Sequence, residues 1–330
     1  MRRSAVGAAA FAVALLAGGC SSDGDDPAAP NSSAAGVTST VAAGQAAAVP
    51  EARTEVAGAT WDGDVVVAGG LTADGRANRR VDAYLPAANR WTARPQLPQG
   101  LHHLGMAVLG ERLYVAGGYT DGPGGEWQAV ASVHSLGLGE SSWRQEPSMT
   151  RPRGAHGLAA VGGRLVVAGG VTGGLTDTTE SWAPGEASWR VGPPLAQARE
   201  HLAMAAVAGR VYVIGGRLGG FDSNLRSVES WDGREAAWRA EAQLNDTRGG
   251  TSAAEVAGKI CVAGGEATNG TIATIECFAP GQGRWARAPS LGSPRHGLAV
   301  AGLGTKLHVI AGGPQPGLFV STTHEVIETA

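Results

Sequence analysis

Arginine recurs at one repeated position of the chain, and this recurrence is the first chemical signal in the sequence. A guanidinium group pairs bidentately with a carboxylate, so arginines gathered around an opening would bind an acidic ligand. The alternative is structural, with each arginine donating to backbone carbonyls inside the fold. The sequence leaves both roles open. The five positions are Arg53, Arg153, Arg199, Arg248 and Arg295.

One repeat departs from this pattern, because Leu101 stands in the arginine position and is followed by two histidines. The loop after it is also the longest of its kind and carries two aromatic residues. Loops of repeat proteins tolerate insertions, but they also carry function disproportionately often. Besides the five arginines, the predicted ligand-binding residues are His102, His103, Tyr119, Trp127 and Arg217.

The patterns of known metal, phosphate and nucleophile sites are missing from the sequence. It has no HExxH, CxxC, Walker or GxSxG motif. Several histidines precede predicted strands, and His156, three residues after Arg153, is interpreted as structural. We therefore predict no metal, no cofactor and no catalytic residue.

Two signals repeat in phase and indicate the elements that must position these side chains. Short apolar runs end in double glycines, whose second members lie 48, 52, 46, 49 and 48 residues apart. A tryptophan follows each of the first five pairs and stands ten residues before the arginine position. The glycine pairs are Gly69-Gly70, Gly117-Gly118, Gly169-Gly170, Gly215-Gly216, Gly264-Gly265 and Gly312-Gly313, and the tryptophans are Trp91, Trp143, Trp189, Trp238 and Trp285.

Each repeat predicts four short strands, here called a to d. In the third repeat, HGLAAV is strand a, LVVAGG strand b, TESW strand c and SWRV strand d. The b strands are apolar and β-branched, as strands buried on both faces are. Each tryptophan of strand d is expected to fill the space between neighbouring units, with its N–H bonded to backbone.

The strings TESWAPGEASW, VESWDGREAAW and IECFAPGQGRW, with the double glycines, resemble the Kelch motif. This resemblance implies an all-β fold, a six-bladed Kelch-type β-propeller with four-stranded blades. It also implies that the b–c and d–a loops share one face, where some Kelch propellers bind ligands. The sixth repeat stops at strand c, His324 to Ile327, so we expect Val41 to Gln45 to supply its last strand. Val49 then falls on the repeat position that Leu195 and Leu244 occupy.

The N-terminal segment predicts export. Residues 1–19 are similar to a signal peptide, with Arg2 and Arg3 before a small-residue apolar run. The run ends in LAGGC, where Cys20 resembles the lipidated cysteine of a bacterial lipobox. Residues 20–40 are polar and rich in proline and serine, as a disordered tether is. The expected protein is a lipoprotein anchored to the bacterial cell membrane outside the cytoplasm, with residues 41–330 as the propeller and a plain signal peptide as the alternative.

The formal net charge of −3 over 330 residues gives no indication of a nucleic-acid partner. We predict a monomer that binds a protein or glycan through its b–c and d–a loops and touches the membrane only through its lipid. The alternative is an enzyme, a sugar-ring epimerase similar to the six-bladed sialic acid mutarotases. Arg217, Asp222 and Glu266 would then support acid–base chemistry. A galactose-oxidase-like copper site is not expected, because Tyr119 alone among the candidate tyrosines falls on a loop.

Two cysteines fall in the predicted propeller, both in the fifth repeat. Cys261 lies in strand b and Cys277 in strand c, which should be antiparallel neighbours. In an oxidising compartment such a pair forms a disulfide if the side chains share a face. The alternative is two buried thiols that behave as small hydrophobes.

Overall fold

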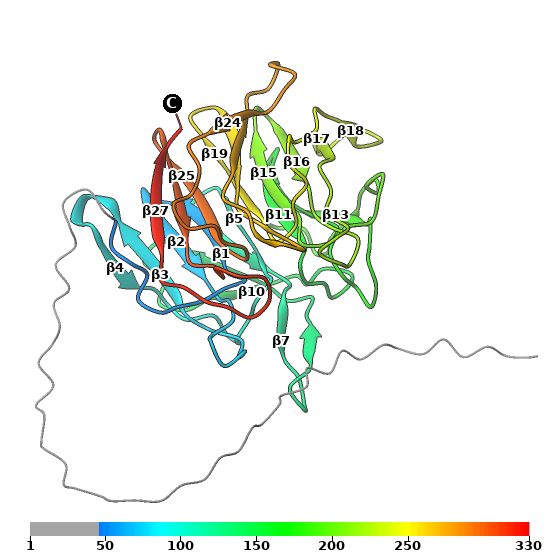
Figure 1. The fold of residues 1–330 in the computed structure, drawn as a ribbon. Helices are drawn as coiled ribbons and strands as arrows, with labels where there is room; N and C mark the ends of the chain where they lie inside the picture. Colours follow the sequence, from blue (N-terminus) through cyan, green and yellow to red (C-terminus); the bar gives the residue numbers. More distant parts are fainter. Residues whose placement is uncertain (1–45, 330) are drawn as a thin grey trace, which may run out of the picture. The chain divides into compact units, whose positions relative to one another are not determined.

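The computed structural model describes residues 46–329, which form β-sheets and one short 3₁₀ turn (Figure 1). The predictions for residues 1–19, for the segment 20–40 with Cys20, and for Val41 to Gln45 lie outside the described residues. Six sheets follow one another along the chain, and we call them blades one to six. In the described residues no helix is long and apolar enough to cross a bilayer.

Blades one to five have four antiparallel strands each, in the order a, b, c and d, and the described part of blade six has three. The a strands are β1 (Ala57–Trp61), β5 (Gly105–Leu109), β11 (Gly157–Val161), β15 (Ala203–Val207), β19 (Ser252–Val256) and β25 (Ala299–Leu303). The b strands are β2 (Asp64–Ala68), β6 (Arg112–Ala116), β12 (Arg164–Ala168), β16 (Arg210–Ile214), β20 (Lys259–Ala263) and β26 (Lys306–Ile310).

The c strands have four or five residues, and the d strands have two to four. The c strands are β3 (Val81–Leu85), β9 (Val133–Gly137), β13 (Thr179–Trp182), β17 (Val228–Trp231), β23 (Ile275–Phe278) and β27 (His324–Glu328). The d strands are β4 (Arg90–Ala93), β10 (Arg144–Glu146), β14 (Arg190–Val191), β18 (Arg239–Ala240) and β24 (Ala286–Ala288). Two b–c loops form hairpins, β7 (Tyr119–Asp121) with β8 (Trp127–Ala129) and β21 (Glu266–Ala267) with β22 (Gly270–Thr271).

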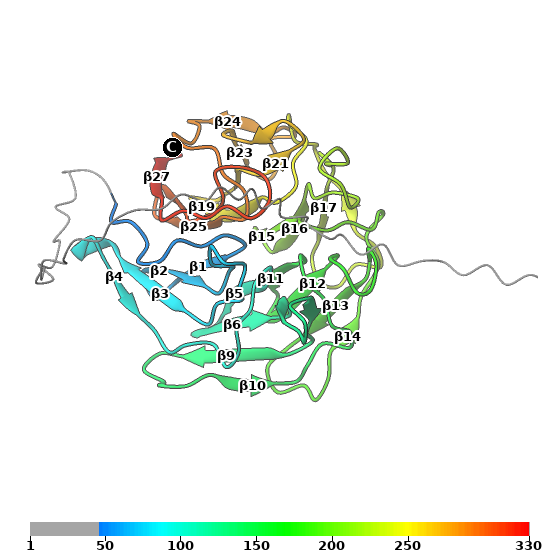
Figure 2. The same ribbon diagram turned by 60° about the horizontal axis from the view of Figure 1, so that its bottom comes forward.

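The blades form a closed ring, which Figure 2 shows with the a strands at its centre. Each a strand packs beside the a strand of the next blade, and β25 packs beside β1. The all-β, six-bladed propeller predicted from the repeats is confirmed. Ring closure brings residues near 55, 103, 201 and 296 to one centre, although they are far apart in the sequence.

The double glycines end the b strands because the backbone there leaves the region that other residues prefer. Gly169 and Gly170 have φ of 67° and 95°, and a Cβ at Gly170 would lie 2.6 Å from the carbonyl oxygen of Gly154. In blade six the pair lies one residue earlier than the sequence analysis placed it. Ala311, with φ of 58°, takes the first position and Gly312 the second.

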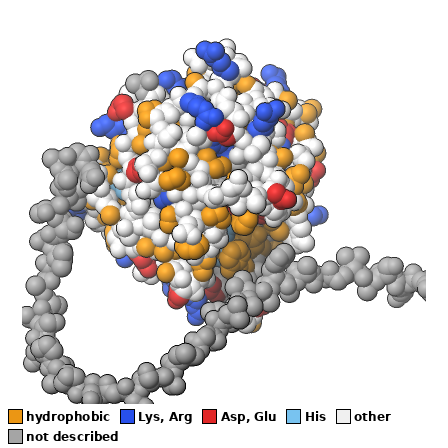
Figure 3. All heavy atoms as spheres, in the orientation of Figure 1, with side chains coloured by type: hydrophobic (Ala, Val, Ile, Leu, Met, Phe, Trp, Pro, Cys, Tyr) orange, Lys and Arg blue, Asp and Glu red, His pale blue; other side chains and the backbone are white. Residues whose placement is uncertain are grey.

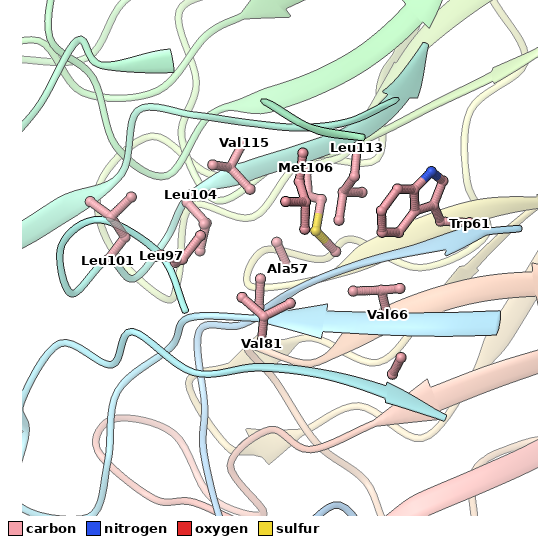
Figure 4. Packing of buried hydrophobic residues seen from close by; sticks show 13 residues of the cluster. Ala57, Trp61, Val66, Val81, Leu97, Leu101, Leu104, Met106, Leu113 and Val115 are labelled. Atoms are coloured by element: carbon pink, nitrogen blue, oxygen red, sulfur yellow. The ribbon is translucent and has the colours of Figure 1, made fainter. Parts of the chain in front are cut away.

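The core lies between blades, as the contact of blades one and two illustrates (Figure 4). Val66 of β2 and Trp61 of β1 face Met106 and Leu113 of the next blade, all in one cluster of buried residues. Burial of such side chains contributes about 1.5–3 kcal/mol each. The apolar b strands therefore hold neighbouring blades together as well as their own.

The five tryptophans lie between neighbouring blades, as predicted. Trp91 lies in β4, whereas the other four stand one residue before their d strands. Each packs toward the preceding unit, and its Nε1–H donates to a backbone carbonyl there. The acceptor lies four residues after the tryptophan position of the preceding unit, as Pro95 lies four after Trp91. The donor–acceptor pairs are Trp91 with Ala47, Trp143 with Pro95, Trp189 with Pro147, Trp238 with Pro193 and Trp285 with Ala242, at 2.8 to 3.0 Å.

The described N-terminal residues lie against blade six. The amide of Val49 donates to the carbonyl of Thr322, and Val49 is 2% exposed within the core between blades six and one. Ala47 accepts from Trp91 as Pro95 does from Trp143. The chain before blade one thus takes the place that the end of strand d has in the other blades.

Cys261 of β20 and Cys277 of β23 are directly paired in the register of blade five. Their Cα atoms lie 4.1 Å apart and their sulfurs form a disulfide. Both side chains belong to the core between blades five and six. The bond therefore joins the b and c strands of one blade without leaving the interior.

Candidate functional site

The d–a and b–c loops of every blade meet on one face of the propeller. In each blade the residue after the arginine position forms a backbone bridge with the first residue of the b–c loop. The pairs are Thr54 with Leu71, His102 with Tyr119, Gly154 with Val171, Glu200 with Arg217, Gly249 with Glu266 and His296 with Gly313. The face expected to carry both loops is therefore present.

The next residue of each d–a loop contributes to a ring around the centre of this face, which we call the inner ring. Five of its amides donate to the carbonyl of the preceding member, and the amide of Val56 closes the circle by donating to Gly297. All six members have φ between 49° and 63°, where non-glycine residues are uncommon. The inner ring consists of Glu55, His103, Ala155, His201, Gly250 and Gly297.

Three inner-ring members carry functional side chains, and these converge. Nε2 of His103 lies 3.0 Å from Nε2 of His201 and 3.2 Å from Oε2 of Glu55. One nitrogen or oxygen from each of the three lies within 4.8 Å of the others, an arrangement able to hold a metal ion. Glycine and alanine in the other three blades leave this centre open.

An arginine between two carboxylates lies beside these histidines. Nε of Arg217 donates to Glu200 at 2.7 Å, and its Nη1 donates to Glu266 at 2.6 Å. The other oxygen of Glu200 lies 2.7 Å from Nδ1 of His201. Because all four side chains are largely buried, these contacts are only weakly screened by solvent.

His296 completes a circuit of side chains around the centre. Its Nδ1 lies 3.3 Å from a carboxylate oxygen of Glu55 and 3.3 Å from one of Glu266. Burial lowers the pKa of His296, but these two carboxylates outweigh it and raise the pKa above its usual value. His296 is the histidine of the cluster that its carboxylate neighbours favour as a cation.

The protonation of Glu55 and His103 follows from their surroundings. Burial raises the pKa of Glu55, yet His103 and His296 hold it below its ordinary value. Burial lowers the pKa of His103 well below its usual range, despite the attraction of Glu55. Near neutral pH, Glu55 is therefore a carboxylate that His296 stabilises, and His103 is a neutral imidazole, whose charge would act on Glu55 only at lower pH.

Aromatic residues of blade two border the inner ring on one side. The ring of Trp127 lies 4.5 Å from that of His102 and 5.2 Å from that of His103, measured between centroids. Tyr119 lies across Gly154 of blade three, where a Cβ would come within 2.2 Å of its ring. Burial and Glu200 together raise the pKa of Tyr119 to about 12, so its hydroxyl stays protonated.

A cavity of about 420 Å³ runs along the centre of the propeller and is bounded by the inner ring. Below the ring its wall is formed by the a strands, with small residues such as Ala59, Ala107 and Ala205 beside larger ones such as Met106 and Leu158. A cavity of this size suits a small ligand. Glu55, His103 and His201 are the polar side chains that the inner ring contributes to its wall.

The five repeated arginines lie away from this centre. Each is at most 1% exposed, bonds to the backbone at the end of its b strand, and pairs with an acidic residue of strand c. This geometry favours the structural role over the ligand-binding role. The pairs are Arg53 with Asp82, Arg153 with Glu180, Arg199 with Glu229, Arg248 with Glu276 and Arg295 with Glu325.

Exposed hydrophobic side chains gather on the b–c loops. Among the large hydrophobic residues that are exposed in the described chain, six lie on these loops, and Leu138 and Val191 lie elsewhere. On the face that Figure 3 draws, charged side chains of both signs are scattered among hydrophobic ones. The six residues, which we call the loop rim, are Trp127, Leu175, Leu218, Phe221, Leu318 and Phe319.

Sequence reasoning found part of this site. The predicted residues that come together at the inner ring are His102, His103, Tyr119, Trp127 and Arg217. It missed Glu55 and Glu200, did not assign a role to His201 or His296, and considered Glu266 only for an epimerase. A signal was present, since Glu55 and His201 both stand two residues after a repeated arginine. The ring closure that joins them was needed to give that signal a meaning.

Comparison with known proteins agrees with this architecture. A family model described as the Kelch motif matches residues 100–150, 152–196 and 198–245, which are blades two to four. The solved structure of YjhT superposes with a TM-score of 0.74 at 17% identity, covering 86% of this chain and 97% of that one. At this identity the likeness shows the fold alone.

Curated relatives match shorter stretches. Kelch-like protein 30 of Homo sapiens is 34% identical over 91 residues, which is 27% of this chain and 15% of that protein. Beta-scruin of Limulus polyphemus is 31% identical over 126 residues, which is 36% of this chain and 13% of that protein. The chain thus spans a small part of the length of these relatives.

Proposed function

Because the chain belongs to the Kelch-repeat family and closes into a six-bladed propeller, we propose that it binds a protein ligand on its b–c and d–a loop face. The observation that carries this proposal is the loop rim, six exposed hydrophobic residues on the b–c loops of blades two, three, four and six. Exposed apolar side chains gathered in one region mark interaction sites. Aromatic residues such as Trp127 and Phe221 supply much of the binding energy in protein interfaces.

The composition of the loop rim favours a protein over a glycan. Leu175, Leu218 and Leu318 are aliphatic and present no donor or acceptor to sugar hydroxyls. The hydrophobic pockets and side chains of a protein partner complement them better. Glycan binding is kept as an alternative outcome of the experiment.

Export and lipidation at Cys20 belong to the same proposal. They rest on the sequence of residues 1–40, which lies outside the described residues. The disulfide between Cys261 and Cys277 supports them, since disulfides persist in oxidising compartments. Wild type should label with palmitate and fractionate with membranes, whereas Cys20→Ala should do neither. Absence of label on the wild type would exclude the lipid anchor.

Binding is tested with the full chain as bait for extracytoplasmic proteins and on a glycan array. Trp127→Ser with Phe221→Ser should weaken capture of the main protein partner at least about tenfold. Leu138→Ser with Val191→Ser removes two exposed hydrophobics that lie off the loop rim and is the matched control. Equal loss in both double variants, or binding to glycans alone, would contradict a protein-binding loop rim.

A second candidate, a sugar-ring epimerase, is favoured by the convergence of Glu200, Arg217 and Glu266. Two carboxylates and an arginine can hold a sugar and move its protons. Both carboxylates are engaged by Arg217 here, so a substrate would have to separate them. Exchange NMR on a panel of reducing sugars tests this function: acceleration lost in Glu266→Gln supports it, and no acceleration eliminates it.

A further inference from the structure

The inner ring directs two imidazoles and one carboxylate at a common point. His103 and His201 both turn Nε2 toward the centre, and Oε2 of Glu55 joins them. Their Nδ1 atoms point outward, to His102 at 2.6 Å and to Glu200 at 2.7 Å. Nε2 of His201 also lies 3.2 Å from Nη2 of Arg217. Where the two imidazoles face each other at 3.0 Å, either one ring N–H bridges them or a metal ion takes the place of that proton.

We propose that Glu55, His103 and His201 bind one divalent transition-metal ion, with Zn²⁺ as the preferred occupant. Two histidines and a glutamate form a known ligand set of catalytic zinc, and two histidines with a carboxylate also hold Fe²⁺. Imidazole nitrogen suits these ions and is a poor ligand for Mg²⁺ or Ca²⁺. This inference does not depend on the protein ligand proposed above.

The spacing of the donors fits a single ion. Ligands at the usual zinc–nitrogen distance of about 2.0–2.1 Å stand about 2.9 Å apart at a right angle and about 3.3 Å apart at the tetrahedral angle. The observed separations are 3.0 Å between His103 and His201 and 3.2 Å between His103 and Glu55. The third pair, His201 and Glu55, lies within 4.8 Å, so the three ligands reach one ion by side-chain movement alone.

The outward contacts resemble those that orient metal ligands. A ligating histidine usually gives its second ring N–H to a carboxylate, which fixes the tautomer and turns the other nitrogen to the metal. Glu200 does this for His201, and Arg217 in turn holds Glu200 at 2.7 Å. Glu200 is therefore a positioning residue, which contacts the metal only through His201.

The charge and shape of the centre also favour a cation. The carboxylates of Glu55, Glu200 and Glu266 surround this point, and they outnumber the single guanidinium of Arg217. Three protein ligands leave a coordination position for water or for an oxygen of a bound molecule. That position borders the 420 Å³ cavity, so an ion there would face a small ligand.

The test is metal binding by the purified full chain after treatment with a chelator. Titration with Zn²⁺ and elemental analysis should give one ion per chain, with no competition from Mg²⁺. His103→Ala and His201→Ala should each weaken binding more than about 100-fold, and Glu200→Gln by about 10–100-fold. His134→Ala removes a buried histidine from strand β9, away from the inner ring, and should bind as wild type does.

A second measurement on the wild type guards against variants that fail to fold. Co²⁺ in the same site should give visible absorption bands of four- or five-coordinate geometry, and Zn²⁺ should abolish them. Co²⁺ should also quench the fluorescence of Trp127, since its ring lies 5.2 Å from that of His103. Subtracting the titration of the Trp127→Phe variant isolates this quenching, which should follow the same binding curve as the absorption bands. Less than one tenth of an ion per chain, or binding unchanged in both histidine variants, overturns the proposal.

Discussion

At the scale of single residues, the repeated arginine acts as an internal crosslink. Arg199 bonds to the carbonyls of Gly215 and Ser227 and pairs with Glu229 at 2.8 Å. Blade two has neither half of the ion pair, because Leu101 replaces the arginine and His134 the acid. Blade two therefore shows that this pair of positions can be filled without an ion pair, by Leu101 and His134.

We expect Arg199→Leu to lower the free energy of unfolding by about 3–5 kcal/mol, because it leaves Glu229 buried without a cation. Adding Glu229→His copies blade two and should restore much of the loss. It should not restore everything, since Glu229 also accepts from the amide of Ala196. Urea unfolding of the two variants decides the point, and a double variant no more stable than Arg199→Leu would contradict this explanation.

Recurrence predicts residues that every blade shares and misses those that differ. The arginines were visible because five repeats carry them, although sequence alone left their role open. Glu55 was missed because its equivalents include Ala155 and Gly250, so no pattern marks the position. The functional side chains of the inner ring are those that depart from the repeat pattern. Their role can be recognised only once ring closure brings them together.

At the scale of elements, the d strands connect neighbouring blades. Trp189 is 4% exposed, stacks with Trp182 at 6.2 Å and donates to the carbonyl of Pro147. This role was predictable, because a fixed spacing places one tryptophan in or directly before the d strand of each of the first five blades. The hairpin β7–β8 was not, since the b–c loops vary in length and sequence from blade to blade.

Trp189→Ala should destabilise the propeller by about 3–5 kcal/mol, the usual range for deleting a buried aromatic side chain. Trp189→Phe keeps most of the buried surface but loses the bond to Pro147, so a smaller loss is expected. Thermal unfolding of both variants measures the difference. An unchanged melting temperature in Trp189→Ala would show that this residue is not part of the interblade core.

The disulfide ties two strands of blade five, with 16 residues of sequence separation. Closing such a loop contributes up to roughly 3 kcal/mol by restricting the unfolded chain. The double variant Cys261→Ala with Cys277→Ala should be less stable by at most that amount. Intact-mass analysis after alkylation without reduction checks the bond itself. Alkyl adducts on both Cys261 and Cys277 would show that it does not form.

At the scale of the whole ring, stability depends on joining the two ends of the chain. Five blades are complete within one repeat each, whereas blade six takes its contacts from residues that precede blade one. Counting back from Arg53 placed Val49 on the repeat position of Leu195 and Leu244, and in the structure all three are buried. Val41 to Gln45, predicted to form the closing strand, remain a prediction because they lie outside the described residues.

Two truncations test this closure. A chain from residue 41 should unfold at the same urea concentration as the full chain. A chain from residue 50 should lose about 3–4 kcal/mol, because it gives up the burial of Val49 and two bonds to Ala47, from Trp91 and from His324. The two truncated chains differ in length by nine residues. Deletion of residues 21–29 from the full chain also removes nine residues and therefore controls for length. If the chain from residue 50 is as stable as the chain from residue 41, the ring does not depend on its N-terminal segment.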